Sequence, residues 1–207
     1  MKRVFAILFL AAVCAGCEKS GRIYRIGDFY YEPGKQGIVF YVTDEGRHGK
    51  IVSLDETQCA WATEAVYEEV GADGQAYDYL DVNSAVHMSP RVLPEAYDYI
   101  DGMKNMKAVR SQPGWRKKYP AFAWCADKGD GWYLPAQTEL LNLYAACLFE
   151  YDEEHWCWSS TSLRYMGGTA PLELNADNFA HIVDMRGSAC ELGDKNYKIY
   201  VRAIAKF

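Results

Sequence analysis

The sequence lacks the features that mark nucleic-acid-binding and membrane-spanning proteins. It carries 22 Lys and Arg against 28 Asp and Glu, and the basic residues form no cluster. A mildly acidic chain of this kind argues against nucleic acid and anionic membrane surfaces as partners. Its one long apolar run, residues 4–16, is shorter than the roughly 18 residues that a bilayer-spanning helix needs.

Signatures of catalysis are also missing. The sequence contains no G-x-S-x-G, no H-E-x-x-H and no Gly-rich phosphate loop. The four histidines stand in unrelated contexts, and His155 and Cys157 lie two residues apart on an expected strand, where packing is the ordinary role. We therefore predict that the protein is not an enzyme and needs no cofactor.

Cysteine is present, but not in a metal-binding pattern. From Cys17 onward the cysteines include no CxxC pair and fit no zinc knuckle. Past residue 17 five remain, so at least one thiol stays unpaired if the others form disulfides. Cys147 and Cys157 could form a disulfide, but buried apolar thiols explain these positions equally well.

The first residues indicate export. Lys2 and Arg3 precede the apolar run, whose length fits the roughly 7–15 residues of a secretory signal. The run ends in "CAGC", which resembles the lipobox of bacterial lipoproteins, although Cys14 stands where leucine is usual. The resemblance implies cleavage after residue 16 and acylation of Cys17, which anchors the chain to the outer membrane of a bacterial envelope. An ordinary secretory signal cut nearby is the alternative.

The rest of the chain has a globular composition, half hydrophobic and 14% aromatic. About 185 residues can bury one substantial core. We expect a polar tether over 17–36 and one domain over 37–207, with an insertion at about 57–114 that contains two short helix-like runs. Strands are expected at 38–43, 50–54, 155–163, 179–185 and 197–207, and helices at 119–127 and 136–149. This order predicts an α+β domain with antiparallel pairing.

The stretch "DGWYLPAQTELLNLY" (130–144) changes period in its middle. Residues 132–134 look like a short buried strand, Pro135 ends it, and Leu140, Leu141 and Tyr144 recur at helical spacing. Glu139 falls in the first helical turn, where the helix dipole favours a negative charge. We interpret this joint as architecture, with its apolar residues in the core.

Six segments together carry a family resemblance: "GIVFYV", "DGMKNMKAV", "AFAWCAD", "GWYLPAQTELLNLY", "WCWSSTS" and "YVRAIAKF". Their order is similar to that of the Fibrobacter succinogenes major paralogous domain family, which also includes the C-terminal domain of the Legionella collagen-like adhesin. The resemblance covers roughly 37–207 and implies a C-type-lectin-like fold, a curved antiparallel sheet flanked by two helices. The family usually has a cysteine after the V-R pair, where this chain has Ala203, so Cys125 lacks the partner that the resemblance would give it.

A long loop at about 163–178 is where such a fold would vary its binding residues. The candidate ligand-binding residues are Arg164, Tyr165, Glu173, Asn175, Asp177 and Asn178. Glu173 and the three residues at 175, 177 and 178 also offer oxygen ligands of the kind calcium prefers. The Glu-Pro-Asn and Trp-Asn-Asp tripeptides of calcium-dependent lectins are absent, so calcium is only an alternative.

We therefore expect a lipid-anchored cell-envelope module that recognises a glycan or a protein outside the cytoplasm without catalysis. The alternative is a structural or accessory subunit of an envelope or pilus-like assembly, and an enzyme of unknown type comes third. Bound nucleic acid is not expected.

Overall fold

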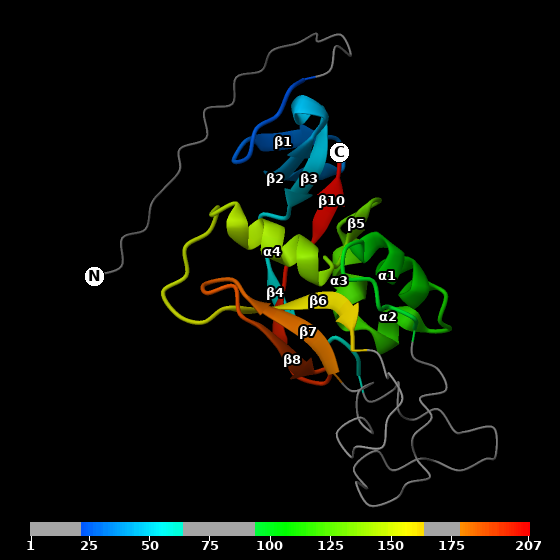
Figure 1. Cartoon of the computed structure of the whole chain (residues 1–207). Coiled ribbons are helices and arrows are strands. Elements are labelled where there is room, and N and C mark those ends of the chain that lie inside the picture. The colour runs from blue at the N-terminus through cyan, green and yellow to red at the C-terminus, as the bar shows by residue number, and fades with distance from the viewer. Residues whose placement is uncertain (1–21, 64–93, 164–178) are drawn as a thin grey trace, which may run out of the picture.

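The computed structural model describes residues 22–63, 94–163 and 179–207 (Figure 1). The strands are β1 (Phe29–Glu32), β2 (Lys35–Thr43), β3 (His48–Val52), β4 (Thr57–Cys59), β5 (Trp132–Tyr133), β6 (Trp156–Ser162), β7 (Phe179–Asp184), β8 (Cys190–Asp194), β9 (Ile199–Val201) and β10 (Ile204–Lys206). The α-helices are α1 (Gly102–Arg110), α2 (Trp115–Lys118), α3 (Pro120–Asp127) and α4 (Gln137–Ala145). The α+β class is confirmed.

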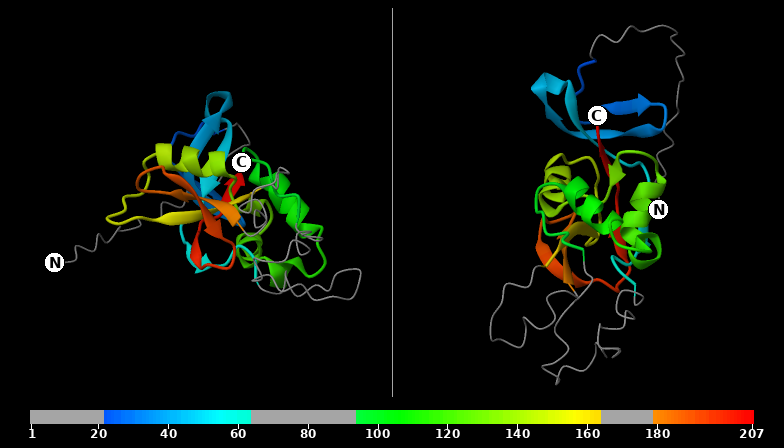
Figure 2. Two further views of the ribbon diagram at one scale, coloured as in Figure 1. Left: turned by 60° about the horizontal axis from the view of Figure 1, so that its bottom comes forward. Right: turned by 90° about the vertical axis from the view of Figure 1, so that its right-hand side faces the viewer.

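The strands form two sheets instead of the single sheet that was expected. The first sheet has the order β1-β2-β3-β10-β5, and the second has the order β4-β9-β6-β7-β8. Every pair in the first sheet is antiparallel, whereas β6 and β9 meet in one parallel bridge, Cys157 with Tyr200. In the described part of the chain four α-helices, not two, accompany these sheets, and α4 lies between them (Figures 1 and 2).

Two segments cross from one sheet to the other, and they contact each other where they cross. The chain leaves β3 at Ser53 and enters β4, and it leaves β9 at Arg202 and enters β10. Ser53 donates its backbone N–H to the Ala203 carbonyl over 2.8 Å, and the Arg202 guanidinium contacts Glu56 at 2.8 Å. The single strand expected at 197–207 is therefore two strands in different sheets.

The domain begins earlier than the sequence predicted. Residues 29–36, which we assigned to the tether, form β1 and the start of β2, with Phe29 opposite Ile38. Upstream of β1, Tyr24 packs its ring 5.1 Å from those of Tyr30 and Phe207. Because these aromatic rings cover one another, the segment from Tyr24 onward is part of the fold.

The expected insertion is also too broad. Trp61, Met106 and Val109 are fully buried in the common core, so neither the residues just after β4 nor α1 decorate the surface. The Trp61 indole donates to the Ser159 carbonyl over 3.0 Å, which joins this segment to β6. Residues 64–93 lie outside the described part of the chain.

The joint at 130–144 has the architectural role that its pattern predicted. Trp132 and Leu134 are buried on one side of Pro135, and Leu140 is buried on the other. Leu141 and Tyr144 are partly buried against the same core. Helix α4 begins at Gln137 and ends at Ala145, shorter than the expected 136–149.

All five cysteines of the described residues are free thiols. Cys157 is buried and Cys147 is exposed, so the disulfide considered for this pair is not formed. Among the described helices, none combines the length and the apolar character that crossing a membrane requires.

Candidate ligand-binding surface

The binding residues predicted from the sequence lie outside the described part of the chain. This holds for Arg164, Tyr165, Glu173, Asn175, Asp177 and Asn178, and for the lipidation site Cys17. The structure does describe the two ends of their loop. Leu163 donates its N–H to the carbonyl of Phe179 over 3.0 Å, so the ends meet as a closed stem between β6 and β7.

An aromatic pair lies beside the stem. Tyr99 packs against His181, which lies two residues past Phe179 on β7. The ring centroids are 5.0 Å apart and the ring planes are tilted by 60°. The Tyr99 hydroxyl lies 2.9 Å from Nε2 of His181. Tyr99 is 44% exposed and its neighbour Ile100 is 69% exposed. We call these three residues, Tyr99, Ile100 and His181, the aromatic surface.

Two residues of the aromatic surface, Tyr99 and Ile100, lie on a turn that Asp98 stabilises. One carboxylate oxygen of Asp98 accepts the N–H groups of Ile100 and Asp101, each at 2.9 Å, and the other lies 2.9 Å from Nζ of Lys104. The Lys104 contact and these two backbone donors lower the pKa of Asp98 to about 2. The carboxylate is consequently charged at neutral pH, and its hydrogen bonds fix the backbone on both sides of Tyr99.

Residues of α1, β6 and α4 also form hydrogen bonds with the backbone of this turn. Buried Asn105 of α1 accepts the Asp98 N–H at 2.8 Å and donates to the Asp98 carbonyl at 2.7 Å. Thr161 of β6 donates to that carbonyl at 2.9 Å, and the N–H of Thr138 in α4 donates to the Tyr99 carbonyl at 2.9 Å. Two helices and a strand thus position one exposed tyrosine, which is how rigid scaffolds present binding residues on loops.

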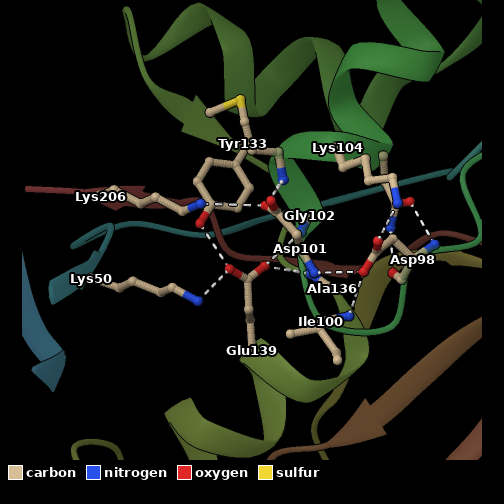
Figure 3. A network of polar contacts seen from close by, with 12 residues as sticks. Lys50, Asp98, Ile100, Asp101, Gly102, Lys104, Tyr133, Ala136, Glu139 and Lys206 are labelled. Carbon is tan, nitrogen blue, oxygen red and sulfur yellow. Dashed lines mark hydrogen bonds and ion pairs between the residues drawn. The ribbon is translucent and has the colours of Figure 1, made fainter. Parts of the chain in front are cut away.

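Glu139, in the first turn of α4, joins that helix to α1, β5 and β3 (Figure 3). Its side chain is buried and points at the start of α1, where Oε2 accepts the N–H of Gly102 at 3.0 Å. The same oxygen accepts the N–H of Ala136 at 2.9 Å, the carboxylate half of a capping box. Its other oxygen accepts the Tyr133 hydroxyl at 2.8 Å and lies 2.7 Å from Nζ of Lys50.

Gly102 is required where this network is tightest. A Cβ atom at this position would lie 2.4 Å from the carbonyl oxygen of Leu134 and 2.8 Å from Oε2 of Glu139. Burial, together with the Glu139 carboxylate, raises the pKa of Tyr133, so its hydroxyl keeps the proton that it donates. The network therefore has a structural role.

The side chains of the aromatic surface are suited to apolar contact with a ligand. Burial lowers the pKa of His181, so at neutral pH the imidazole is uncharged and can accept the Tyr99 hydroxyl hydrogen. Two rings and an aliphatic side chain suit the apolar face of a sugar or an apolar protein side chain. Among the described residues, no group of three or more His, Cys, Asp or Glu side chains is placed to hold a metal ion.

The pair His155 and Cys157 is not arranged as a nucleophile with its base. His155 stacks between Tyr151 and Tyr200, at centroid distances of 4.0 and 3.8 Å, and its Nε2 lies 3.1 Å from Glu56. Burial raises the pKa of the Cys157 thiol, which keeps it protonated. The packing role that we expected for both residues agrees with these contacts.

A shallow cleft of about 360 Å³ lies elsewhere, between the β1–β2 turn and the end of α3. Its lining includes Leu54, Trp132 and the ion pair of Lys128 with Asp55, whose Nζ and Oδ1 are 2.6 Å apart. Trp132 is almost fully buried, so the cleft offers no exposed aromatic face.

The aromatic surface was not predicted from the sequence, because residues 57–114 were assigned to an insertion. The available signal was local: Asp98 and Asp101 flank Tyr99 and Ile100, and Asp101 accepts the Met103 N–H at 3.1 Å as the N-cap of α1. An aspartate turn that leads into a capped helix predicts a rigid loop. No family model matches the chain, and no curated protein matches it at a significant level.

Proposed function

We propose that the protein is a lipid-anchored binding module of the bacterial cell envelope. In this proposal Cys17 carries the anchor, the domain has a C-type-lectin-like fold, and it recognises a glycan or a protein outside the cytoplasm without catalysis. The ligand contacts the aromatic surface and residues of the segment between Leu163 and Phe179.

The pairing of the last strand with strands from earlier in the domain supports the fold assignment. The last strand, β10, lies between β3 and β5, so the first and last parts of the domain share one sheet. The four helices lie between these two parts in the sequence, an arrangement similar to that of C-type-lectin-like domains. The six sequence segments that carry the resemblance point the same way.

One observation carries the functional proposal: the turn that Asp98 holds exposes Tyr99 and Ile100 beside the loop stem. Folding gains little from large apolar side chains left in water, whereas a binding surface gains from them. Because the surrounding backbone is already ordered, a ligand would meet Tyr99 in place and the entropy cost of binding would be small.

The test is a glycan-array screen of the mature chain with Cys17→Ser, run with calcium and with a chelator. Selective binding that survives the chelator supports a calcium-independent lectin. Binding that the chelator abolishes would instead bring Glu173, Asn175, Asp177 and Asn178 to the centre. Absence of binding by a folded sample counts against a glycan ligand and directs the search to a protein partner.

Tyr99→Ala identifies the surface. We expect it to weaken binding at least about tenfold, as truncation of a central interface aromatic does. The matched control is Tyr31→Ala. Tyr31 is also exposed, but it lies on β1 of the first sheet, whereas His181 of the aromatic surface lies on β7 of the second. Equal affinities for Tyr99→Ala and the parent would place the ligand elsewhere.

A further inference from the structure

Exposed apolar side chains are concentrated at the start of the described chain. Ile23, Ile26 and Tyr31 are 58%, 51% and 61% exposed, and Phe29 lies between them in the sequence. These four residues, which we call the N-terminal apolar group, occupy only nine positions of the chain. Single exposed apolar residues are ordinary, but a group of four in so short a segment indicates a contact surface.

The segment that carries them is ordered. Tyr24 donates its N–H to the Gly46 carbonyl and Gly27 donates to the Val39 carbonyl, both over 2.8 Å. The N–H of Arg25 donates to the Asp28 carboxylate at 2.8 Å, and β1 pairs with β2 along its full length. The exposed side chains are therefore held in place by a backbone that is already paired.

The distance to the proposed anchor is short. Four residues separate Cys17 from Arg22, where the described chain begins. Five steps of an extended chain reach at most roughly 18 Å. A flexible chain of that length has a root-mean-square reach of roughly 12 Å. If Cys17 is acylated, the N-terminal apolar group therefore stays within a tether's length of the bilayer.

We propose that the N-terminal apolar group rests on the phospholipid surface that holds the Cys17 acyl chains. This inference depends on the lipid anchor of the proposed function. A short tether gives the surface a high effective concentration, so even a weak apolar contact is occupied most of the time. Isoleucine and phenylalanine enter the acyl boundary, while the tyrosine hydroxyl stays at the level of the headgroups.

Charge contributes little to this contact. Arg22 and Arg25 are balanced by Asp28 and Glu32 within the same segment, in keeping with a chain that has no basic cluster. Docking is consequently apolar, insensitive to salt, and independent of anionic lipid.

The contact also orients the domain. The strands β1, β2 and β3 lie at one end of the molecule, and β7, which carries His181, lies at the other (Figures 1 and 2). With β1 against the bilayer, the aromatic surface is directed away from it, where a ligand outside the membrane can reach it.

Hydroxyl-radical footprinting of the acylated full-length mature chain tests the proposal. The protein is placed in phosphatidylcholine vesicles and compared with the soluble Cys17→Ser chain, and oxidation of each tyrosine is measured by mass spectrometry. Tyr31 and Tyr197 form a matched pair, 61% and 65% exposed, and Tyr197 follows β8 at the far end of the second sheet. We expect oxidation of Tyr31 to slow several-fold in vesicles, while that of Tyr197 is unchanged, at low and high salt alike.

A substitution pair separates the apolar contact from simple proximity. Ile23→Ser with Ile26→Ser should restore the oxidation of Tyr31, whereas Leu192→Ser, an exposed site on β8, should leave its protection intact. Equal oxidation of Tyr31 in vesicles and in solution, protection of Tyr197 instead, or protection that survives the double substitution would each overturn the inference. The same mass spectra show whether Cys17 is acylated, so a missing anchor, which refutes the proposed function, is distinguished from a failed contact.

Discussion

Nζ of Lys50 lies 2.7 Å from Oε1 of Glu139, and this ion pair joins β3 of the first sheet to the first turn of α4 (Figure 3). Glu139 is 1% exposed and Lys50 is 17% exposed at their side chains. Because the same carboxylate accepts hydrogen bonds from Tyr133 and Gly102, it connects the start of α1, β5 and β3 at one point. The turn that displays Tyr99 leads into this framework at Gly102.

Glu139→Ala should strongly destabilise the fold. It leaves the Lys50 ammonium, the Tyr133 hydroxyl and the Gly102 N–H without their acceptor in a buried site. Removing one partner from a buried ion pair costs about 3–5 kcal/mol of unfolding free energy. Urea denaturation measures the loss, with Glu150→Ala, an exposed glutamate after α4, as the control. A change within about 0.5 kcal/mol, as expected for a surface site, would contradict the role assigned to Glu139.

Asp98 should make stability depend on pH in the acid range. The contacts to Lys104 and to two backbone N–H groups lower its pKa from 3.8 to about 2 in the folded state, so the folded protein binds this proton less readily than the unfolded chain. The contribution of Asp98 to the free energy of unfolding is therefore complete above pH 3.8 and is lost as pH falls towards 2. Thermal unfolding across this range should show a shallower dependence in Asp98→Asn. Asp152→Asn, at an exposed aspartate, should follow the parent; identical curves for all three proteins would refute the prediction.

His155 and His181 should make stability depend on pH in a higher range. Burial lowers the pKa of His155 from 6.5, against the opposing effect of Glu56, and burial likewise lowers the pKa of His181. In the folded state both imidazoles therefore favour the neutral form. Their contribution to the free energy of unfolding is complete above pH 6.5 and is lost as pH falls through the lowered pKa values of the folded state. NMR titration of the imidazole rings should place both midpoints below 6.5.

The substitution His155→Phe separates the contribution of His155 to the pH dependence of stability from that of His181. Phenylalanine can occupy the stack between Tyr151 and Tyr200 but cannot be protonated, so part of the pH dependence below 6.5 should disappear and the share of His181 should remain. An imidazole midpoint for His155 at or above 6.5 in the parent would show that Glu56, not burial, controls its charge.

Thiol reactivity should follow exposure. Cys147 and Cys190 are exposed, whereas Cys125 and Cys157 are buried. Burial raises the pKa of both buried thiols, so these residues carry little of the reactive thiolate. Brief treatment of the native protein with N-ethylmaleimide should modify Cys147 and Cys190 and leave the two buried thiols unmodified until urea is added. Peptide mapping by mass spectrometry measures this; a disulfide between Cys147 and Cys157 would contradict the structure.

The elements that the sequence predicted correctly are those whose pattern is local. The hairpin of β2 and β3, helix α3, strand β6 and the joint of β5 with α4 were each visible in their own residues, because apolar periodicity and a proline boundary depend only on near neighbours. The placement of Glu139 in the first turn of α4 was predicted on the same basis.

The candidate site was predictable only in part. Asp98 and Asp101 gave a local turn signal around Tyr99, but its ring-contact and hydrogen-bond partner His181 is 82 residues away. Nothing near Tyr99 in the sequence specifies that β7 will lie beside it. The loop candidates Arg164 to Asn178 stay predictions, since they lie outside the described residues.

By itself, then, the sequence determined the α+β class, the strand-to-helix joint and most of the local elements, through propensities that act over a few residues. Tertiary structure alone decided that β1 joins the domain, that the chain changes sheets at Ser53 and Arg202, and that one buried carboxylate has Lys50, Gly102 and Tyr133 as partners. These contacts join residues far apart in the chain, and which of them form depends on how all the elements bury their apolar faces together.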